Sequence, residues 1–318
     1  MIRCLALAER ISALGHLVSF ACLALEGNLN AKIVSSGFEL IEAPTEADPG
    51  TWIPERNQYD VCVIDRYDLD YLYESKLRSV AKGIIAIDDW GARKHDANAI
   101  IDPSISSGTL ARRQMNPGVP FHSGPEWVLL RREFARLNTT ATERTAFKKV
   151  LVFFGGTDPT DQMIRYYEEI SKRPMPLEFH FLISSHHPRL SEFRSLHDSP
   201  TCQIDIAPSN MADYLSGMDL YLGSAGTISW ERMCVGVTGL VVSIVPNQVD
   251  LARTLDGMGL HRYLGSSDAI SATDALTKLV SELDHSERLS EMSRRSIALI
   301  DGNGCERVAR IINIESEE

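Results

Sequence analysis

Residues 150–158 read Val-Leu-Val-Phe-Phe-Gly-Gly-Thr-Asp, an apolar run that breaks into two glycines. Such a run, bounded by turn residues, is typical of a buried strand in a parallel sheet. Gly155 and Gly156 would let the backbone approach a ligand closely, and a helix beginning after them would offer free N–H groups to a phosphate. The same residues also fit a plain strand–helix turn in which Asp158 caps the helix. By itself this stretch leaves both interpretations open.

A second stretch of the same kind lies at residues 220–231, which read Leu-Tyr-Leu-Gly-Ser-Ala-Gly-Thr-Ile-Ser-Trp-Glu. We expect a strand, then a turn of small residues, then a helix. Ser224, Ala225 and Gly226 would leave room for a flat ring or a diphosphate against the backbone. Glu231 follows further along the helix, where its carboxylate could accept two hydrogen bonds from a ribose diol. The alternative is a plain turn with Glu231 on a solvated helix face.

A third polar loop, Val245-Pro246-Asn247-Gln248, follows the next expected strand. Asn247 and Gln248 each offer both donors and acceptors. Open α/β sheets bind their ligands at the carboxyl ends of the strands, which is where all three loops would lie. Three such loops in succession favour a nucleotide-diphosphate site in the C-terminal half.

Short β-branched runs alternate with amphipathic helical stretches along the whole chain, which predicts an α/β fold with mostly parallel strands. The segment 137–147 is polar and has no hydrophobic period, so we expect a linker there. It would separate two doubly wound, Rossmann-like domains, residues 1–137 and residues 148–318. The expected strands are 17–22, 61–65, 84–88, 99–101, 150–154, 179–183, 202–206, 220–222 and 239–245, with helices at 2–14, 28–36, 69–81 and 272–312.

Two groups of charged residues follow expected strands in the first half. Asp65-Arg66-Tyr67 comes after one strand, and Asp88-Asp89-Trp90 comes after another, with Arg93, His95 and Asp96 close behind. Paired aspartates fit a metal or general-acid site, and capping or salt bridging fits the same spacing. No role is assigned to the isolated histidines His16, His186 and His187.

The composition excludes several classes of function. A net charge of −11 is not that of a protein that binds a nucleic-acid backbone. The longest apolar runs, such as 240–246, are far shorter than a membrane span, and no signal peptide opens the sequence, so we expect a cytoplasmic protein without membrane contact. The six cysteines lack disulfide or zinc spacing and fit buried free thiols. We expect neither a metal nor a cofactor.

Together these stretches resemble one family, the UDP-2,4-diacetamido-2,4,6-trideoxy-β-L-altropyranose hydrolases of pseudaminic acid biosynthesis. That family is related to the GT-B glycosyltransferase that adds N-acetylglucosamine to the peptidoglycan lipid precursor. The resemblance implies a GT-B fold, in which two Rossmann-like domains face a central cleft. The matching stretches occur in the family's order over nearly the whole chain: 3–8, 87–89 with Arg93, His95 and Asp96, 129–134, 154–158, 224–231, 247–248 and 301–304.

The resemblance implies metal-independent hydrolysis of a small-molecule partner, a UDP-linked sugar. Water would displace UDP from the anomeric carbon with inversion. Because UDP is a good leaving group, a helix N-terminus that stabilises its charge would be the main electrostatic contribution. Glu231 would bind the ribose hydroxyls. Of the other implied binding residues, Ser224, Ala225 and Gly226 would contact the nucleotide, Gly155, Gly156 and Thr157 the diphosphate, and Asn247 and Gln248 the diphosphate or the sugar.

In the family, the stretch that matches residues 3–8 follows a strand and a Gly-x-Gly-His loop, whose histidine is the base or positions the water. Met1 stands where the residue after that histidine would be, and residues 2–14 predict a helix that ends at Gly15. We therefore expect an in-frame upstream segment of roughly 15–25 codons that encodes the strand and the loop. Without it, the chain should bind UDP and hydrolyse the sugar nucleotide barely or not at all.

Two other functions fit the same residues. A GT-B glycosyltransferase would use a UDP-sugar donor with a separate acceptor and would hydrolyse little without that acceptor. A catalytically inactive UDP-binding protein would bind UDP without turnover. Turnover measured with and without an acceptor separates the three.

Overall fold

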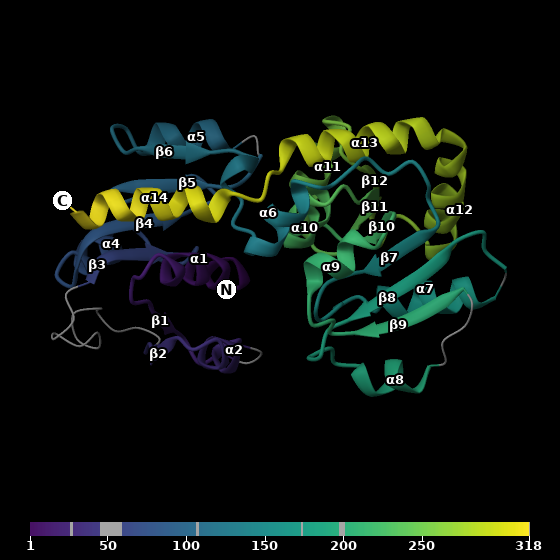
Figure 1. Cartoon of the computed structure of the whole chain (residues 1–318), viewed down its shortest axis with the longest axis horizontal. Helices are drawn as coiled ribbons and strands as arrows, with labels where there is room; N and C mark the ends of the chain where they lie inside the picture. The colour runs from purple at the N-terminus through teal and green to yellow at the C-terminus, as the bar shows by residue number, and fades with distance from the viewer. Residues whose placement is uncertain (26–27, 45–58, 106–107, 173, 197–200, 318) are drawn as a thin grey trace. The chain divides into compact units, whose positions relative to one another are not determined.

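The computed structural model describes residues 1–25, 28–44, 59–105, 108–172, 174–196 and 201–317. By its internal contacts the chain divides into two compact units (Figure 1). The first unit comprises Met1–Arg132 and Gly302–Glu318, and the second comprises Glu133–Asp301. Within the described ranges, no helix is long and apolar enough to cross a membrane.

The first unit contains two parallel sheets. Four strands pair in chain order, β3-β4-β5-β6, and β1 and β2 form a separate pair. In the larger sheet the register sets Ile85 opposite Ala99, and both side chains are buried. The strands are β1 (Ser19–Cys22), β2 (Glu39–Glu42), β3 (Tyr59–Ile64), β4 (Ala81–Ile87), β5 (Ala99–Asp102) and β6 (Phe121–Ser123).

Helix α1 (Ile2–Ala13) packs on strands of both sheets. Apolar residues recur along it at helical spacing, which gives it an extended apolar surface. Leu7 packs with Ile85 of the four-stranded sheet, and Leu5 packs with Phe20 of the β1–β2 pair. The helix therefore joins two sheets that share no backbone hydrogen bonds among the described residues.

The C-terminal helix α14 (Gly304–Glu317) lies beside α1 on the four-stranded sheet (Figure 1). Its Val308 and Ile312 are buried in the same core cluster as Ile85. We had expected residues 148–318 to form one domain, and the structure differs: the apolar face of α14 is covered by the first unit. The remaining helices of this unit are α2 (Asn30–Ser35), α4 (Tyr71–Leu77), α5 (Thr109–Met115) and the 3-10 turn η1 (Pro125–Trp127).

The second unit is built on one six-stranded parallel sheet of order β12-β11-β10-β7-β8-β9. Successive side chains of a strand point to opposite faces, and Val150 and Leu151 of β7 are both fully buried, so both faces are covered. Helices α7, α12 and α13 contribute to the core on one face. The strands are β7 (Lys149–Phe153), β8 (Glu178–Ile183), β9 (Cys202–Ile206), β10 (Leu220–Gly223), β11 (Thr238–Ser243) and β12 (Arg262–Ser266).

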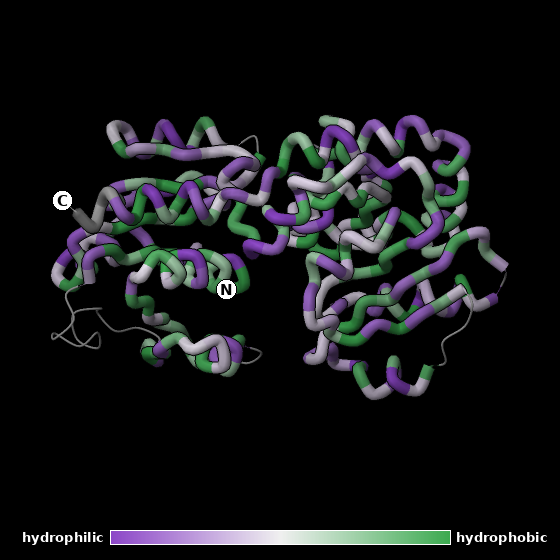
Figure 2. Tube along the Cα trace, viewed as in Figure 1, coloured by the Kyte–Doolittle hydropathy of each residue, from purple (hydrophilic) through white to green (hydrophobic). Residues whose placement is uncertain are grey.

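The helices of the second unit are amphipathic. Figure 2 shows hydrophilic and hydrophobic residues alternating along α13, whose Leu289 and Met292 are buried. The helices are α6 (Arg132–Asn138), which begins at the boundary of the units, α7 (Gln162–Ser171), α8 (Leu190–Ser195), α9 (Met211–Ser216), α10 (Thr227–Cys234), α11 (Val249–Gly257), α12 (Ala272–Glu282) and α13 (Ser286–Leu299), with 3-10 turns η2 (Pro246–Gln248) and η3 (Leu283–His285).

The structure confirms each expected strand and the predicted α/β class with parallel sheets. It adds β2, β6 and β12, which we had not predicted. Residues 139–148 form neither helix nor strand, and the expected linker 137–147 lies within the second unit, which begins at Glu133. The segment is held to the second unit, because the Arg144 guanidinium donates to the carbonyl oxygens of Ser216, Met218 and Val235.

Candidate functional site

The order of the second sheet defines where a ligand would bind. From β7 the chain proceeds to β8 and β9 on one side, and then to β10, β11 and β12 on the other. The two directions part between β7 and β10. In open α/β sheets, ligands bind outside the carboxyl ends of the strands at this topological switch point. The predicted loops after β7 and β10 therefore flank that point, and the loop after β11 is the next along.

Backbone contacts hold the turns after β7 and β10 against each other. The Ser224 N–H donates to the Phe153 carbonyl oxygen at 3.1 Å. The Tyr221 hydroxyl lies 2.8 Å from that oxygen and 2.7 Å from the Ser224 carbonyl oxygen. A Cβ on Gly223 would lie only 1.9 Å from the Phe153 oxygen, so no other residue fits there. The small-residue turn is thus fixed to the end of β7.

Helix α10 begins directly after this turn with an N-terminus suited to an anion. Gly226 precedes it with φ +155°, a conformation that favours glycine. The first N–H groups of any α-helix lack intrahelical acceptors and carry partial positive charge. The first turn of α10 contains no acidic residue, and Thr227 is exposed. A phosphate could therefore reach these N–H groups.

The N-terminus of α7 has a different character. Asp158 is buried with φ +39°, and its Oδ2 accepts the Met163 N–H at 2.7 Å. A carboxylate of the chain itself already caps this helix, so a phosphate would meet a negative charge there. Asp158 therefore caps α7 through its side chain, although the N-cap residue of the helix is Asp161, three residues further on. Gly156 and Thr157 remain exposed beside it.

The remaining predicted residues lie on α10 and after β11. Glu231 is only 8% exposed, so the alternative of a solvated helix face is wrong. The Gln248 Oε1 accepts the Ile244 N–H at 2.9 Å and shapes the turn after β11. Asn247 is exposed on that turn.

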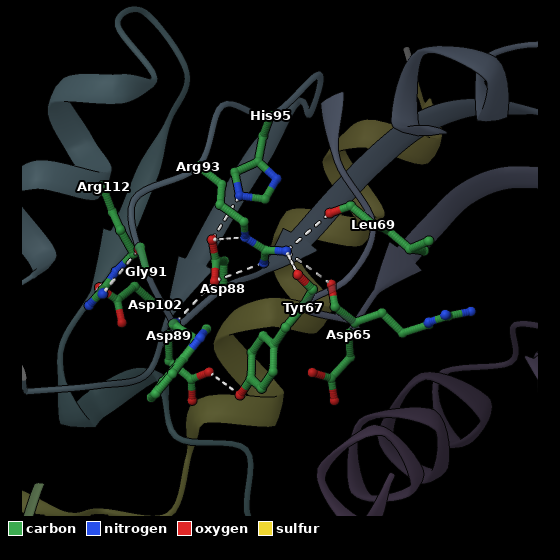
Figure 3. Close-up of polar contacts among 12 residues, drawn as sticks. Asp65, Tyr67, Leu69, Asp88, Asp89, Gly91, Arg93, His95, Asp102 and Arg112 are labelled. Carbon is green, nitrogen blue, oxygen red and sulfur yellow. Dashed lines mark hydrogen bonds and ion pairs between the residues drawn. The ribbon is translucent and has the colours of Figure 1, made fainter. Parts of the chain in front are cut away.

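A network of charged side chains lies at the carboxyl ends of β3 and β4 in the first unit (Figure 3). Asp88, directly after β4, accepts the Trp90 N–H at 3.0 Å and forms an ion pair with Arg93 at 3.0 Å. The His95 Nε2 lies 2.9 Å from Asp88 Oδ2. These contacts lower the pKa of Asp88, although burial acts in the opposite direction. The salt-bridging interpretation therefore holds for Asp88.

The other nitrogen of His95 has a carboxylate partner as well. Its Nδ1 lies 2.7 Å from Glu74 Oε1, and the Glu74 Oε2 accepts the Asp96 N–H at 2.7 Å. Burial alone would lower the pKa of His95, but the bonds to Asp88 and Glu74 raise it to about 9. The ring is therefore charged at neutral pH and donates from both nitrogens. Among the described residues, no three side chains gather as a metal site.

Asp89 belongs to a more accessible part of the network. The Arg3 guanidinium donates to Asp89 at 2.7 Å and to Asp65 at 2.6 Å. The Tyr67 hydroxyl donates to Asp89 at 2.5 Å, and the rings of Tyr67 and Trp90, two residues that are each about half exposed, are 6.3 Å apart. The two predicted groups of charged residues thus meet at one sheet edge.

Arg3 and Glu74 are the two members of this network to which the sequence had given no role. Arg3 stands in a matching stretch, but only the fold shows that α1 lies beside β3. Glu74 looks like an ordinary surface residue of a short helix, because nothing in its neighbourhood indicates burial. Its partner His95 lies 21 residues away, which no local pattern reveals.

No protein-family model matches the chain. Among curated proteins, an uncharacterised protein of Methanocaldococcus jannaschii is 23% identical over 222 residues, 66% of this chain and 46% of that protein. The chain thus spans about half the length of that relative. The spore coat polysaccharide biosynthesis protein SpsG of Bacillus subtilis is 21% identical over 246 residues, 76% of this chain and 72% of SpsG.

Solved structures share the fold over nearly the whole chain. MurG of Acinetobacter baumannii is 14% identical with a TM-score of 0.67, covering 98% of this chain and 95% of MurG. UDP-GlcNAc 2-epimerase of Neisseria meningitidis, solved bound to UDP-GlcNAc, is 11% identical with a TM-score of 0.63 and covers 98% and 95%. Together with the two parallel α/β units, these similarities confirm the predicted GT-B fold.

Proposed function

We propose that the protein acts on a UDP-linked sugar and that its second unit holds the UDP end. The observation that carries this proposal is the N-terminus of α10, which opens at the switch point after a turn of small residues and has no acid in its first turn. Glu231 would bind the ribose hydroxyls. In the same proposal Ser224, Ala225 and Gly226 contact the nucleotide, Gly155, Gly156 and Thr157 border the diphosphate, and Asn247 and Gln248 lie near the diphosphate or the sugar.

We further propose that the reaction is hydrolysis of a UDP-linked 2,4-diacetamido-2,4,6-trideoxy sugar. The ordered resemblance to that hydrolase family supports it, and the name of the relative SpsG refers to polysaccharide biosynthesis. Water attacks the anomeric carbon and releases its proton to the solvent, while the bond from that carbon to the diphosphate oxygen breaks. UDP leaves with the electron pair, and the N-terminus of α10 stabilises its charge without a metal.

Transfer to an acceptor is the second candidate, and the fold shared with solved glycosyltransferases favours it. The test is release of UDP from the trideoxy diacetamido sugar nucleotide, followed with and without added acceptor sugars. Hydrolysis predicts equal UDP release in both cases and the free sugar as product. Release that depends on an acceptor would support transfer, and no release with intact UDP binding would support an inactive UDP-binding protein.

The nucleotide site itself can be tested at Thr227. An aspartate at this exposed first residue of α10 places a negative charge where the diphosphate would bind, and it also favours the helix. We expect Thr227→Asp to weaken UDP binding roughly tenfold or more without lowering the melting temperature. Calorimetric titration with UDP measures the effect. Ser286→Asp, at the exposed start of α13, is the matched control and should bind UDP as the wild type does.

A further inference from the structure

The small-residue turn after β10 contains one backbone donor that the chain leaves unused. The Ser224 N–H donates to the Phe153 carbonyl oxygen at 3.1 Å. The Gly226 N–H donates to the Ser229 Oγ at 3.4 Å. Ala225, between them, is only 2% exposed, and its N–H has no acceptor among the residues that the structure describes. Buried N–H groups without an acceptor are rare in folded proteins, so this one indicates an acceptor from outside the chain.

The direction of this N–H is set by Tyr221. The Tyr221 hydroxyl donates to the Ser224 carbonyl oxygen at 2.7 Å. Burial raises the pKa of Tyr221, so the hydroxyl keeps its proton and donates throughout the neutral range. In a trans peptide unit the C=O and the N–H point in opposite directions, so a carbonyl that faces Tyr221 directs the Ala225 N–H away from it. The contact therefore fixes the whole peptide unit between Ser224 and Ala225.

The ring of Tyr221 is itself held in place. The fully buried Arg232 guanidinium lies over its face, 5.0 Å from the ring centroid. That guanidinium donates to the Val237 carbonyl oxygen at 2.8 Å and to the His261 Nδ1 at 2.9 Å. At the other end of the ring, a Cβ on Gly223 would lie 2.6 Å from the Tyr221 hydroxyl oxygen, so the hydroxyl occupies the space that a side chain there would need. The ring therefore has little freedom to move its hydroxyl away from the turn.

We propose that the Ala225 N–H donates to the diphosphate of the nucleotide, and that Tyr221 is the positioning residue that aims it. This inference rests on the proposed UDP site. Ala225 lies two residues before Thr227, the first residue of α10, so its N–H joins the first N–H groups of that helix in binding one anion. A hydrogen bond from an N–H to an ionised phosphate is stronger than one between neutral groups. Tyr221 touches no reacting atom and acts only through the peptide unit that it holds.

Removal of the hydroxyl tests the positioning role. Phenylalanine fills the same space, so Tyr221→Phe releases the Ser224 carbonyl while the ring keeps its place. We expect this variant to weaken UDP binding roughly 5- to 20-fold by calorimetric titration. Tyr214→Phe is the matched control, because it also removes a hydroxyl that donates a hydrogen bond, at 2.9 Å to Asp205 of β9 at the edge of the sheet. The control should bind UDP as the wild type does.

Uridine separates positioning from a general loss of structure. It carries the ribose and the base but no phosphate, so in this proposal it uses Glu231 and not the Ala225 N–H. We expect Tyr221→Phe to bind uridine as the wild type does, as followed by NMR titration, while its UDP affinity falls. A variant that binds UDP as tightly as the wild type overturns the positioning role. Equal losses of affinity for UDP and uridine overturn it as well, because they indicate that Tyr221 serves only the stability of the unit.

The donor can be observed directly in the wild-type protein, so the test does not depend on the folding of a variant. In protein labelled with ¹⁵N-alanine, the Ala225 amide signal is identified by its absence from Ala225→Gly. We expect UDP to move its proton resonance downfield, as a new hydrogen bond to phosphate does, and uridine to leave it nearly unmoved.

The outcomes distinguish this inference from the proposed function. If UDP binds by calorimetry but moves the Ala225 amide no more than uridine does, the inference is overturned and the UDP site stands, with water as the acceptor of that N–H. A wild type that binds no UDP overturns the proposed function and the inference together.

Discussion

Two buried histidines, one in each unit, show how partners decide the charge of a side chain. Burial disfavours a charged His95, yet its two carboxylate partners raise its pKa to about 9. His261 lies beside Arg232, and burial together with that guanidinium lowers the pKa of His261 to about 3. Its Nε2 donates to the Ala252 carbonyl oxygen at 2.8 Å, which leaves Nδ1 to accept from Arg232 at 2.9 Å.

His95 makes the stability of the first unit depend on pH in a defined direction. Its folded pKa lies above the unfolded value, so the unfolded state binds fewer protons between pH 6.5 and about 9. His95 contributes at most about 3 kcal/mol to the free energy of unfolding. This contribution is fully present below pH 6.5 and is lost as the pH rises through 9. Urea unfolding of wild type and His95→Gln over this range measures it. The variant should lack this slope, and exposed His285→Gln should retain it.

At single residues the sequence left pairs of interpretations that only the folded structure resolves. Asp158 as a cap was one of two expectations, and its partner Met163 is only five residues away. For Asp88, a metal or general-acid site and salt bridging fitted the same spacing, because the charge of its partner His95 depends on Asp88 together with Glu74 of α4, which lies 21 residues from His95. Long-range pairs of this kind leave no periodic pattern in the chain.

At the scale of elements, the two sheets of the first unit differ in how well they are supported. Strand β4 has neighbours on both sides and is buried along most of its length. Strands β1 and β2 have only each other among the described residues, and Ala21 in β1 is exposed. Two-stranded sheets are marginally stable and depend on packing, which α1 supplies through Leu5.

We therefore expect local opening to begin at the β1–β2 pair. Amide hydrogens in Ser19–Cys22 and Glu39–Glu42 should exchange at least about tenfold faster than those in Ala81–Ile87 under native conditions. Hydrogen exchange followed by NMR or mass spectrometry measures the difference. Equal protection in the two sheets would mean that α1 couples them into a single cooperative unit.

The strands that sequence analysis predicted and those it missed differ in length and composition. Long apolar runs such as residues 150–154 predict buried strands, and the structure contains this one as β7. Strand β6 has three residues, two of them polar, and is too short to show a period. Strand β12 contains Gly265, a residue type common in turns, so its sequence resembles a turn. Its pairing with β11 is also irregular.

For the whole molecule, the most consequential feature is that α14 completes the first unit. A chain shortened to end at Asp301 would expose the apolar surface that Val308, Ala309 and Ile312 now cover. Losing three buried apolar contacts of this size costs several kcal/mol, enough to unfold a domain of ordinary stability. We expect calorimetry to show loss of the transition of the first unit and retention of that of the second.

A matched control for this truncation ends at Asn313, which keeps the three apolar residues and should preserve both transitions. If the chain ending at Asp301 also kept both, α14 would be dispensable for the first unit. The second domain expected from the sequence, residues 148–318, would then describe the folding unit better than the division of the chain by its internal contacts.

The same feature sets an order of events during synthesis. The second unit is one continuous segment, Glu133–Asp301, and can fold as soon as it has left the ribosome. The first unit must wait for the last residues of the chain, and until then Leu7 and Ile85 remain uncovered. A nascent chain stalled or released shortly before its end therefore presents an incomplete apolar face beside a finished domain, which is the kind of surface that chaperones bind.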